Sequence, residues 1–154
     1  MAKPAAGRER ERRTSGGTEI VHILDSTLES VDSAEALALD AARCAGLDDD
    51  ELQKIGMAVR ESMVNAVVHG NRYNAHKKVR LSIVGGPDRL AVKIADEGEG
   101  FDFDNVPDPL APENLLRSCG RGIFLMRAFM DEFQVRRLNP NGTEVTLIKY
   151  LVSK

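Results

Sequence analysis

The chain has 154 residues, of which 42% are hydrophobic and 29% are charged, and this is the size and make-up of one ordinary globular domain. No stretch approaches the roughly 18 consecutive apolar residues of a membrane helix, and the N-terminus has no apolar segment typical of a signal peptide, so we expect a cytoplasmic protein with no membrane partner. The formal net charge of −3 argues against a direct nucleic-acid partner, because binding to phosphate backbones relies on an excess of Lys and Arg.

The N-terminal residues 1–17 differ in composition from the rest of the chain. They hold five basic and two acidic side chains and too few apolar ones to form a core. Such a segment cannot bury enough apolar area to offset the entropy lost on ordering. We therefore predict a disordered basic tail over 1–17 and a folded domain over 18–154.

A strand and a helix are predicted next. Residues 19–24 are mainly apolar and β-branched, which is typical of a strand. Apolar residues then recur at helical spacing until Gly46, and Ser30 or Ser33 is the expected N-cap of this helix. The spacing is carried by Ala34, Leu37, Ala38, Ala41 and Ala45.

A second helix is predicted from the acidic residues 48–50 to His69. Negative charge at its start suits the positive end of the helix dipole, and Gly70 ends its apolar pattern. Residues 78–86 and 89–97 then read as two strands joined by a tight turn rich in Gly and Pro, which predicts a hairpin.

The stretch 98–120 is rich in Gly and Pro and has little periodicity. Loops beyond roughly 12 to 15 residues are uncommon in compact domains unless they are functional or disordered, so this loop is a candidate lid. A helix over 122–130 is expected after it, and two strands over 132–138 and 143–152 complete the chain.

This order of elements predicts a two-layer α/β sandwich. Strands that follow one another directly form hairpins, so the sheet is expected to be mixed and mostly antiparallel. Three helices are available to cover one face of it.

Four groups of residues stand out chemically. Glu61, Asn65 and His69 are four apart, so on the second helix they form one polar stripe; a solvated helix face would look the same. Asp96 ends a strand and is followed by Gly98 and Gly100, which combines a carboxylate acceptor with a backbone that a flat ligand can approach closely.

The third group lies directly behind the candidate lid. Gly120 and Gly122 open a helix, where unpaired backbone N–H groups bind phosphate well, although a flexible hinge would also use glycines. Thr143 then follows Gly142 at the start of the last strand.

The four patterns in this order resemble the four sequence boxes of the GHKL (histidine-kinase-like) ATPases, whose ATP-binding fold is of the Bergerat type. Within that superfamily the chain is most similar to the anti-sigma-factor serine/threonine kinases. The run 61–70 looks like their first box, and the run 120–133 looks like the helix that follows their lid.

The resemblance implies ATP and Mg²⁺ as cofactors and a role for each matching residue. Asn65 is the Mg²⁺ ligand, and Glu61 is the general base for a serine hydroxyl. Asp96 accepts the adenine amino group, and Gly98, Gly100 and Thr143 complete the adenine site. Gly120 and Gly122 hold the phosphates.

Three further residues have less specific roles. Arg117 and Arg121 flank the phosphate-binding glycines and are placed to neutralise the γ-phosphate. His69 either orients the phosphate-binding face or simply interacts favourably with the helix dipole.

The resemblance also implies partners: an anti-anti-sigma protein with a STAS domain as substrate, a sigma factor, and a second copy in a homodimer. Two alternatives stay open at this point. One is a nucleotide-binding switch that sequesters a partner without phosphate transfer, and the other is a detached catalytic domain of a sensor kinase.

Overall fold

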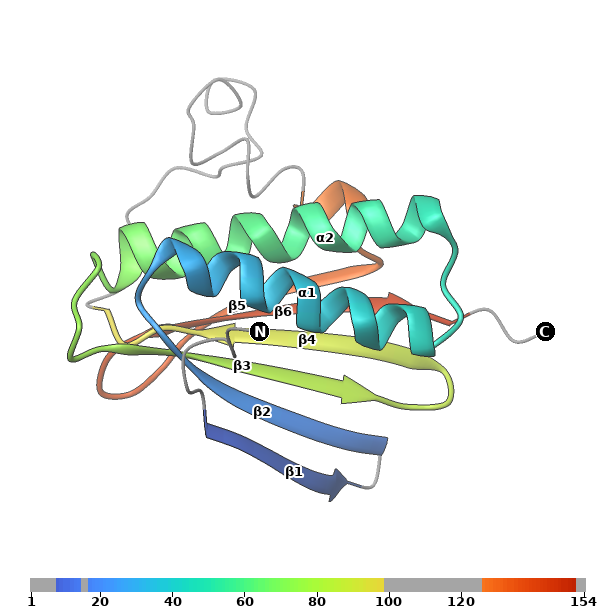
Figure 1. Ribbon diagram of the computed structural model, residues 1–154, viewed down its shortest axis with the longest axis horizontal. Helices are drawn as coiled ribbons and strands as arrows, with labels where there is room; N and C mark the ends of the chain where they lie inside the picture. The colour runs from blue at the N-terminus through green and yellow to red at the C-terminus, as the bar shows by residue number, and fades with distance from the viewer. Residues whose placement is uncertain (1–7, 15–16, 99–125, 152–154) are drawn as a thin grey trace, which may run out of the picture.

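The computed structural model describes residues 8–14, 17–98 and 126–151, and these form two layers, with helices on one face of a single sheet (Figure 1). The sheet has the strand order β1-β2-β3-β4-β6-β5. Its strands are β1 (Arg8–Thr14), β2 (Gly17–Asp25), β3 (Lys78–Gly85), β4 (Arg89–Ala95), β5 (Glu132–Arg137) and β6 (Thr143–Tyr150).

All five pairings between the described strands are antiparallel, which confirms the prediction of a mostly antiparallel sheet. Strands β4 and β5 nevertheless run in the same direction, because β6 lies between them and is antiparallel to both. The chain that leaves the end of β4 must therefore return to the end of the sheet at which β4 began before β5 can start. Residues 126–129, at the end of that connection, are helical and lie on the same side of the sheet as the other helices (Figure 1).

Two long helices cover the sheet in antiparallel directions (Figure 1). Helix α1 (Leu28–Cys44) begins one turn earlier than predicted: Thr27 is its N-cap and accepts a bond from the Ser30 backbone N–H at 3.3 Å. The prediction of Ser30 or Ser33 as the N-cap is therefore wrong. Ser30 already lies in the first turn, and the Ser33 hydroxyl donates to the Glu29 carbonyl inside the helix.

Helix α2 (Asp49–Val64) confirms the predicted acidic start. Asp48 is the N-cap, and its carboxylate accepts a bond from the Glu51 N–H at 2.9 Å. Asp49, Asp50 and Glu51 occupy the first turn, where their charges complement the unpaired N–H groups.

The core lies between the two layers. Alternate residues of the strands point toward the helices, as the registers Leu81↔Ile94 and Ile83↔Val92 show, and their side chains meet the apolar stripe of each helix. The fully buried members with the largest side chains include Val31, Ile55, Val59, Met63, Leu81, Ile94, Met126 and Leu147. No helix in the described ranges is long and apolar enough to cross a membrane.

The prediction of a disordered tail is wrong for residues 8–14, which form strand β1 at the edge of the sheet. Composition missed it because β2 offers a free row of backbone groups to which a charged segment can bond without burying its side chains. Arg12 contacts Glu19 across the pair at 2.9 Å and holds the pKa of that carboxyl below its ordinary value. Charged edge strands of this kind discourage pairing with other chains.

Candidate nucleotide-binding site

The candidate site begins at the C-terminal end of the second helix, where the helix changes type. Residues 65–70 continue α2 as a π-helix, η1 (Asn65–Gly70), in which the Asn71 N–H bonds to the Ala66 carbonyl at 2.8 Å. A π-helix uses i→i+5 bonds, is rare, and occurs most often at functional sites. The predicted single helix over 48–69 therefore has the right extent, but its last turn is π-helical and wider than an α-helical turn.

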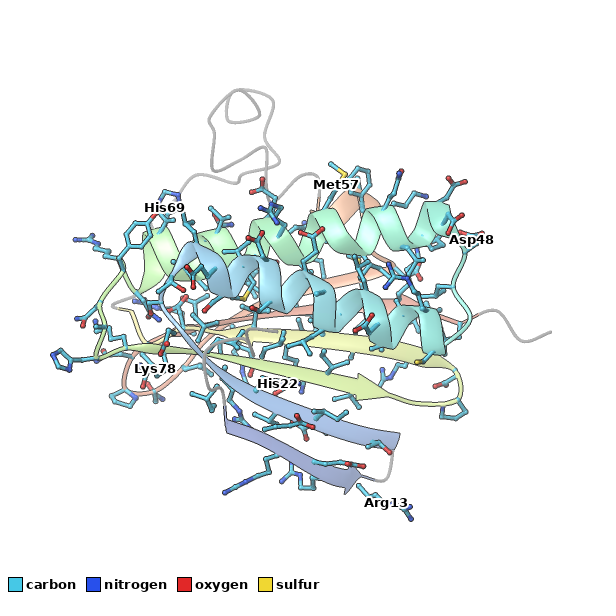
Figure 2. All side chains as sticks on the ribbon, in the orientation of Figure 1. Arg13, His22, Asp48, Met57, His69 and Lys78 are labelled. Atoms are coloured by element: carbon cyan, nitrogen blue, oxygen red, sulfur yellow. The ribbon has the colours of Figure 1, made fainter. Side chains whose placement is uncertain are left out.

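The polar stripe on this helix is partly preserved. Glu61 and Asn65 are one α-helical turn apart, and both are partly exposed, so their side chains are accessible to a ligand. His69 lies one π-helical turn further on and is exposed at the end of the helix, which Figure 2 shows at the same end of the molecule as Lys78. The wider turn rotates His69 away from the α-helical position on which the predicted stripe relied.

Asp96 is the centre of the site, directly after β4. Its side chain is buried, with only 8% of the residue exposed, and its Oδ1 accepts bonds from the N–H groups of Gly98 at 3.0 Å and Thr143 at 3.3 Å. Burial raises the pKa of Asp96, while the two N–H groups and the charge of Lys77 oppose that rise. Within the described part of the chain, Oδ2 has no hydrogen-bond partner, so it is the oxygen available to a ligand.

Three glycines from different segments surround Asp96. A Cβ atom on Gly70, at the end of η1, would be 2.5 Å from Asp96 Oδ2. A Cβ atom on Gly98 would collide with the Gly70 carbonyl, and one on Gly142 would collide with the Asp96 carbonyl. Gly142 also has φ of 120°, where a residue with a side chain would be strained. Only glycine lets these backbones close around the carboxylate.

Thr143 supplies a second polar atom beside Asp96. Its backbone exchanges bonds with Asp96, and its hydroxyl is buried without a partner among the residues that the structure describes. A buried hydroxyl without a bond carries a desolvation cost of about 1–3 kcal/mol, so it indicates a ligand or an ordered water. A carboxylate acceptor and a hydroxyl to which no described residue bonds, lined by bare backbone, fit the amino edge of adenine.

The site also has to accommodate the divalent cation that the resemblance implies. The described residues contain no group of three His, Cys, Asp or Glu side chains that could hold a metal ion. Mg²⁺ in nucleotide sites is commonly held by one or two protein oxygens together with phosphates and water. The Asn65 amide oxygen fits that arrangement because it is a hard, uncharged ligand.

Five predicted site residues lie outside the described residues, together with the candidate lid and the start of the helix predicted over 122–130. They are Gly100, Arg117, Gly120, Arg121 and Gly122. Their predicted roles in holding the base edge and the phosphates therefore stay predictions.

Two residues that shape the site have no predicted role of their own. Gly142 is far from Asp96 in sequence, and only the pairing of β4 with β6 brings it there. Asn71 follows η1, is only 2% exposed, and bonds to three other segments. The only signal for Asn71 in the sequence is its place after Gly70, which also fits a simple helix end.

A two-layer sandwich with this glycine-lined carboxylate at a strand end is the arrangement expected of a nucleotide-binding domain. The comparisons with known proteins specify the class further. The chain belongs to the family of histidine kinase-like ATPase domains, whose pattern matches residues 24–149.

Curated relatives cover most of the chain. The serine-protein kinase RsbW of Bacillus subtilis is 33% identical over 147 residues, which are 92% of this chain and 84% of the relative. The protein of the same name from Staphylococcus epidermidis is 30% identical over 92% of this chain and 86% of the relative. The anti-sigma F factor of Bacillus thuringiensis is 38% identical over 72% of this chain and 79% of the relative.

Proposed function

We propose that this protein is an ATP-dependent serine-protein kinase that also acts as an anti-sigma factor. The observation that carries the proposal is Asp96, a buried carboxylate with one oxygen bound to backbone and the other without a hydrogen bond from any described residue. Beside it lies the Thr143 hydroxyl, which likewise has no partner among the described residues. This pair supports ATP as the ligand. The names of the relatives support serine as the acceptor and a sigma factor as the partner.

In the proposed reaction ATP supplies the phosphoryl group, and Asp96 and Thr143 orient the purine. Asn65 would hold Mg²⁺ through its amide oxygen, and the metal would neutralise part of the phosphate charge. Glu61 accepts the proton of the substrate serine as that oxygen bonds to the γ-phosphorus, while the bond from this phosphorus to the bridging oxygen breaks and ADP leaves. A positioned base of this kind typically contributes about 10²- to 10⁴-fold in rate.

The proposed partners follow from the same likeness. The substrate is the serine of an anti-anti-sigma protein with a STAS domain, and the kinase releases or captures its sigma factor according to the phosphorylation state of that substrate. We further propose that the protein acts in the cytoplasm as a homodimer.

The first prediction tests Glu61. The variant Glu61→Gln keeps the shape of the side chain but is too weak a base to take the serine proton. Phosphate transfer from labelled ATP to the anti-anti-sigma protein should fall by roughly 10²- to 10⁴-fold. The affinity for ATP, measured by calorimetry, should stay within about threefold of wild type, because Glu61 is assigned no contact with the base.

Asp50→Asn is the matched control, because it removes the same charge from an exposed position on the same helix. It should transfer phosphate at the wild-type rate. If the wild type binds ATP but phosphorylates no serine, the protein is a switch without turnover. Transfer to a histidine would instead identify a sensor-kinase catalytic domain, and no binding of ATP would refute the site itself.

A further inference from the structure

Asn71 is a buried side chain that joins three separate segments of the chain. Its Nδ2 donates to Ser26 Oγ at 2.9 Å, after β2, and to the Lys78 carbonyl at 3.0 Å, at the start of β3. Its Oδ1 accepts the Glu97 backbone N–H at 2.8 Å. With two donors and one acceptor engaged, the amide is well satisfied for a residue that is only 2% exposed.

The bond to Glu97 controls the turn that carries Asp96. Glu97 lies between Asp96 and Gly98, and its side chain returns to accept the Lys78 N–H at 2.5 Å. The turn is therefore held on one side by Asn71 and on the other by β3. Because Gly98 donates to Asp96 Oδ1, the position of this turn also sets the orientation of the carboxylate.

The backbone around Asn71 is shaped to deliver its side chain to this place. The Asn71 N–H closes the π-helix on Ala66, and the Tyr73 N–H bonds to the Val67 carbonyl at 3.0 Å. Arg72 and Tyr73 both adopt left-handed conformations, with φ of 52° and 58°, which residues with side chains rarely do. Strained backbone of this kind persists where the surrounding structure fixes it, often at a ligand site.

Asn71 also follows Gly70, which packs directly against the Asp96 carboxylate. One pair of consecutive residues therefore places Asp96 in two ways: Gly70 leaves room for the carboxylate, and Asn71 fixes the turn behind it. Both belong to the end of the helix that carries Glu61 and Asn65. Gly70 and Asn71 therefore connect Asp96, which is assigned to the base, with the helix whose residues are assigned to the metal and to the substrate serine.

We propose that Asn71 is a positioning residue for purine recognition, acting through the Glu97 amide to hold Asp96 at the angle that selects adenine. The inference rests on the proposed ATP-binding function. It adds a residue that contacts no ligand but sets the preference for one base.

The test compares ATP with GTP, because a role in positioning Asp96 affects the base and leaves the phosphates unchanged. In Asn71→Ala the ratio of ATP affinity to GTP affinity, measured by calorimetry well below the unfolding temperature, should fall by roughly tenfold, as expected when the one hydrogen bond between adenine and a displaced Asp96 is lost. Ser26→Ala is the matched control. It removes a partner of the same amide but leaves the Glu97 bond intact, so the ratio should stay as in wild type.

A purely structural role would lower stability in both variants and leave the ratio unchanged, and that result in folded Asn71→Ala would overturn the inference. Amide exchange in the wild type gives a second test that needs no variant. The Glu97 side chain is exposed, yet its backbone N–H should exchange slowly without nucleotide. Exchange at the rate of a free amide would overturn the inference, whereas failure of the wild type to bind ATP would refute the proposed function instead.

Discussion

At the scale of single residues, Asp96 combines a stability cost with a function. Its carboxylate is buried beside backbone and glycine, with no described cation in direct contact, so the protein holds an acid where its charged form is disfavoured. The two N–H bonds from Gly98 and Thr143 reduce this cost without removing it. A residue kept under such conditions is expected to serve a ligand, and its replacement should separate function from stability.

The variant Asp96→Asn tests this separation. Because burial raises the pKa of Asp96 above its ordinary value of 3.8, the folded protein binds this proton more tightly than the unfolded chain does. Stability from Asp96 is therefore fully present below pH 3.8 and is lost as pH rises through the raised value. The amide does not titrate, so the free energy of unfolding of Asp96→Asn, relative to wild type, should increase across that window and stay higher at neutral pH.

The same variant should bind ATP more weakly by roughly 10- to 100-fold, as expected when a hydrogen bond to a charged acceptor is lost. Urea unfolding at a series of pH values and calorimetry with ATP give the two readouts. If Asp96→Asn lowered both the affinity for ATP and the free energy of unfolding at neutral pH, the result would contradict the assignment of Asp96 as a ligand-binding group.

At the scale of elements, α2 and η1 contain two glycines that differ in whether a side chain would fit in their place. Gly56 lies in the middle of α2, where a Cβ atom would meet Glu35 and Leu39 at 3.5 Å, an ordinary contact distance. Gly70 lies at the end of η1 against Asp96, where a Cβ atom has no room. The helix interior therefore tolerates alanine, and the helix end does not.

Gly56→Ala should raise the free energy of unfolding by about 0.5–1 kcal/mol, because alanine is the better helix former. Gly70→Ala should displace the Asp96 carboxylate and weaken ATP binding by roughly tenfold or more, since base recognition depends on its place. Calorimetry and urea unfolding of both variants check the pair. Equal ATP affinity in Gly70→Ala and Gly56→Ala would show that the close approach of η1 to Asp96 is not required.

The elements that the sequence predicts well are those with periodic apolar residues facing the core. Strands β2, β3 and β4 and helices α1 and α2 each have such a pattern, which burial imposes. The π-helical turn η1 leaves no comparable pattern, because one wider turn changes the spacing only once. Strand β1 was missed for a different reason: an edge strand is stabilised by its backbone bonds to β2 and needs no apolar face.

At the scale of the whole molecule, the order of the motifs predicts that Asp96 and Thr143 share a site but not how closely they lie. Glu61, Asn65, Asp96 and Thr143 are each recognisable in the sequence, yet the bond between Thr143 and Asp96 spans 47 positions and exists only because β6 pairs with β4. The burial of Asp96 and the approach of Gly70 and Gly142 likewise depend on the packed layers. Local sequence cannot encode such distances, because they are set by residues far along the chain.

The layers are also joined at the end of the molecule opposite the site, by a largely buried ion pair. Lys149 on β6 places its ammonium 2.5 Å from Glu51 in the first turn of α2 and 3.7 Å from Asp131, and it donates to the Phe129 carbonyl at 3.4 Å. One cation thus holds together α2, the last strand and the segment that returns from the crossover. Removing it leaves the partly buried Glu51 carboxylate without its counter-charge.

Lys149→Met should therefore lower the free energy of unfolding by about 2 kcal/mol or more, whereas Arg43→Met, which breaks an exposed pair with Asp40, should cost at most about 0.5 kcal/mol. Glu51→Gln combined with Lys149→Met should recover about 1 kcal/mol of the loss, because the isolated charge is gone. Urea unfolding of the two single variants and the double variant measures this coupling. Strictly additive effects would mean that the pair does not join the layers, and the crossover segment would then depend on apolar contacts such as those of Met126 and Met130 alone.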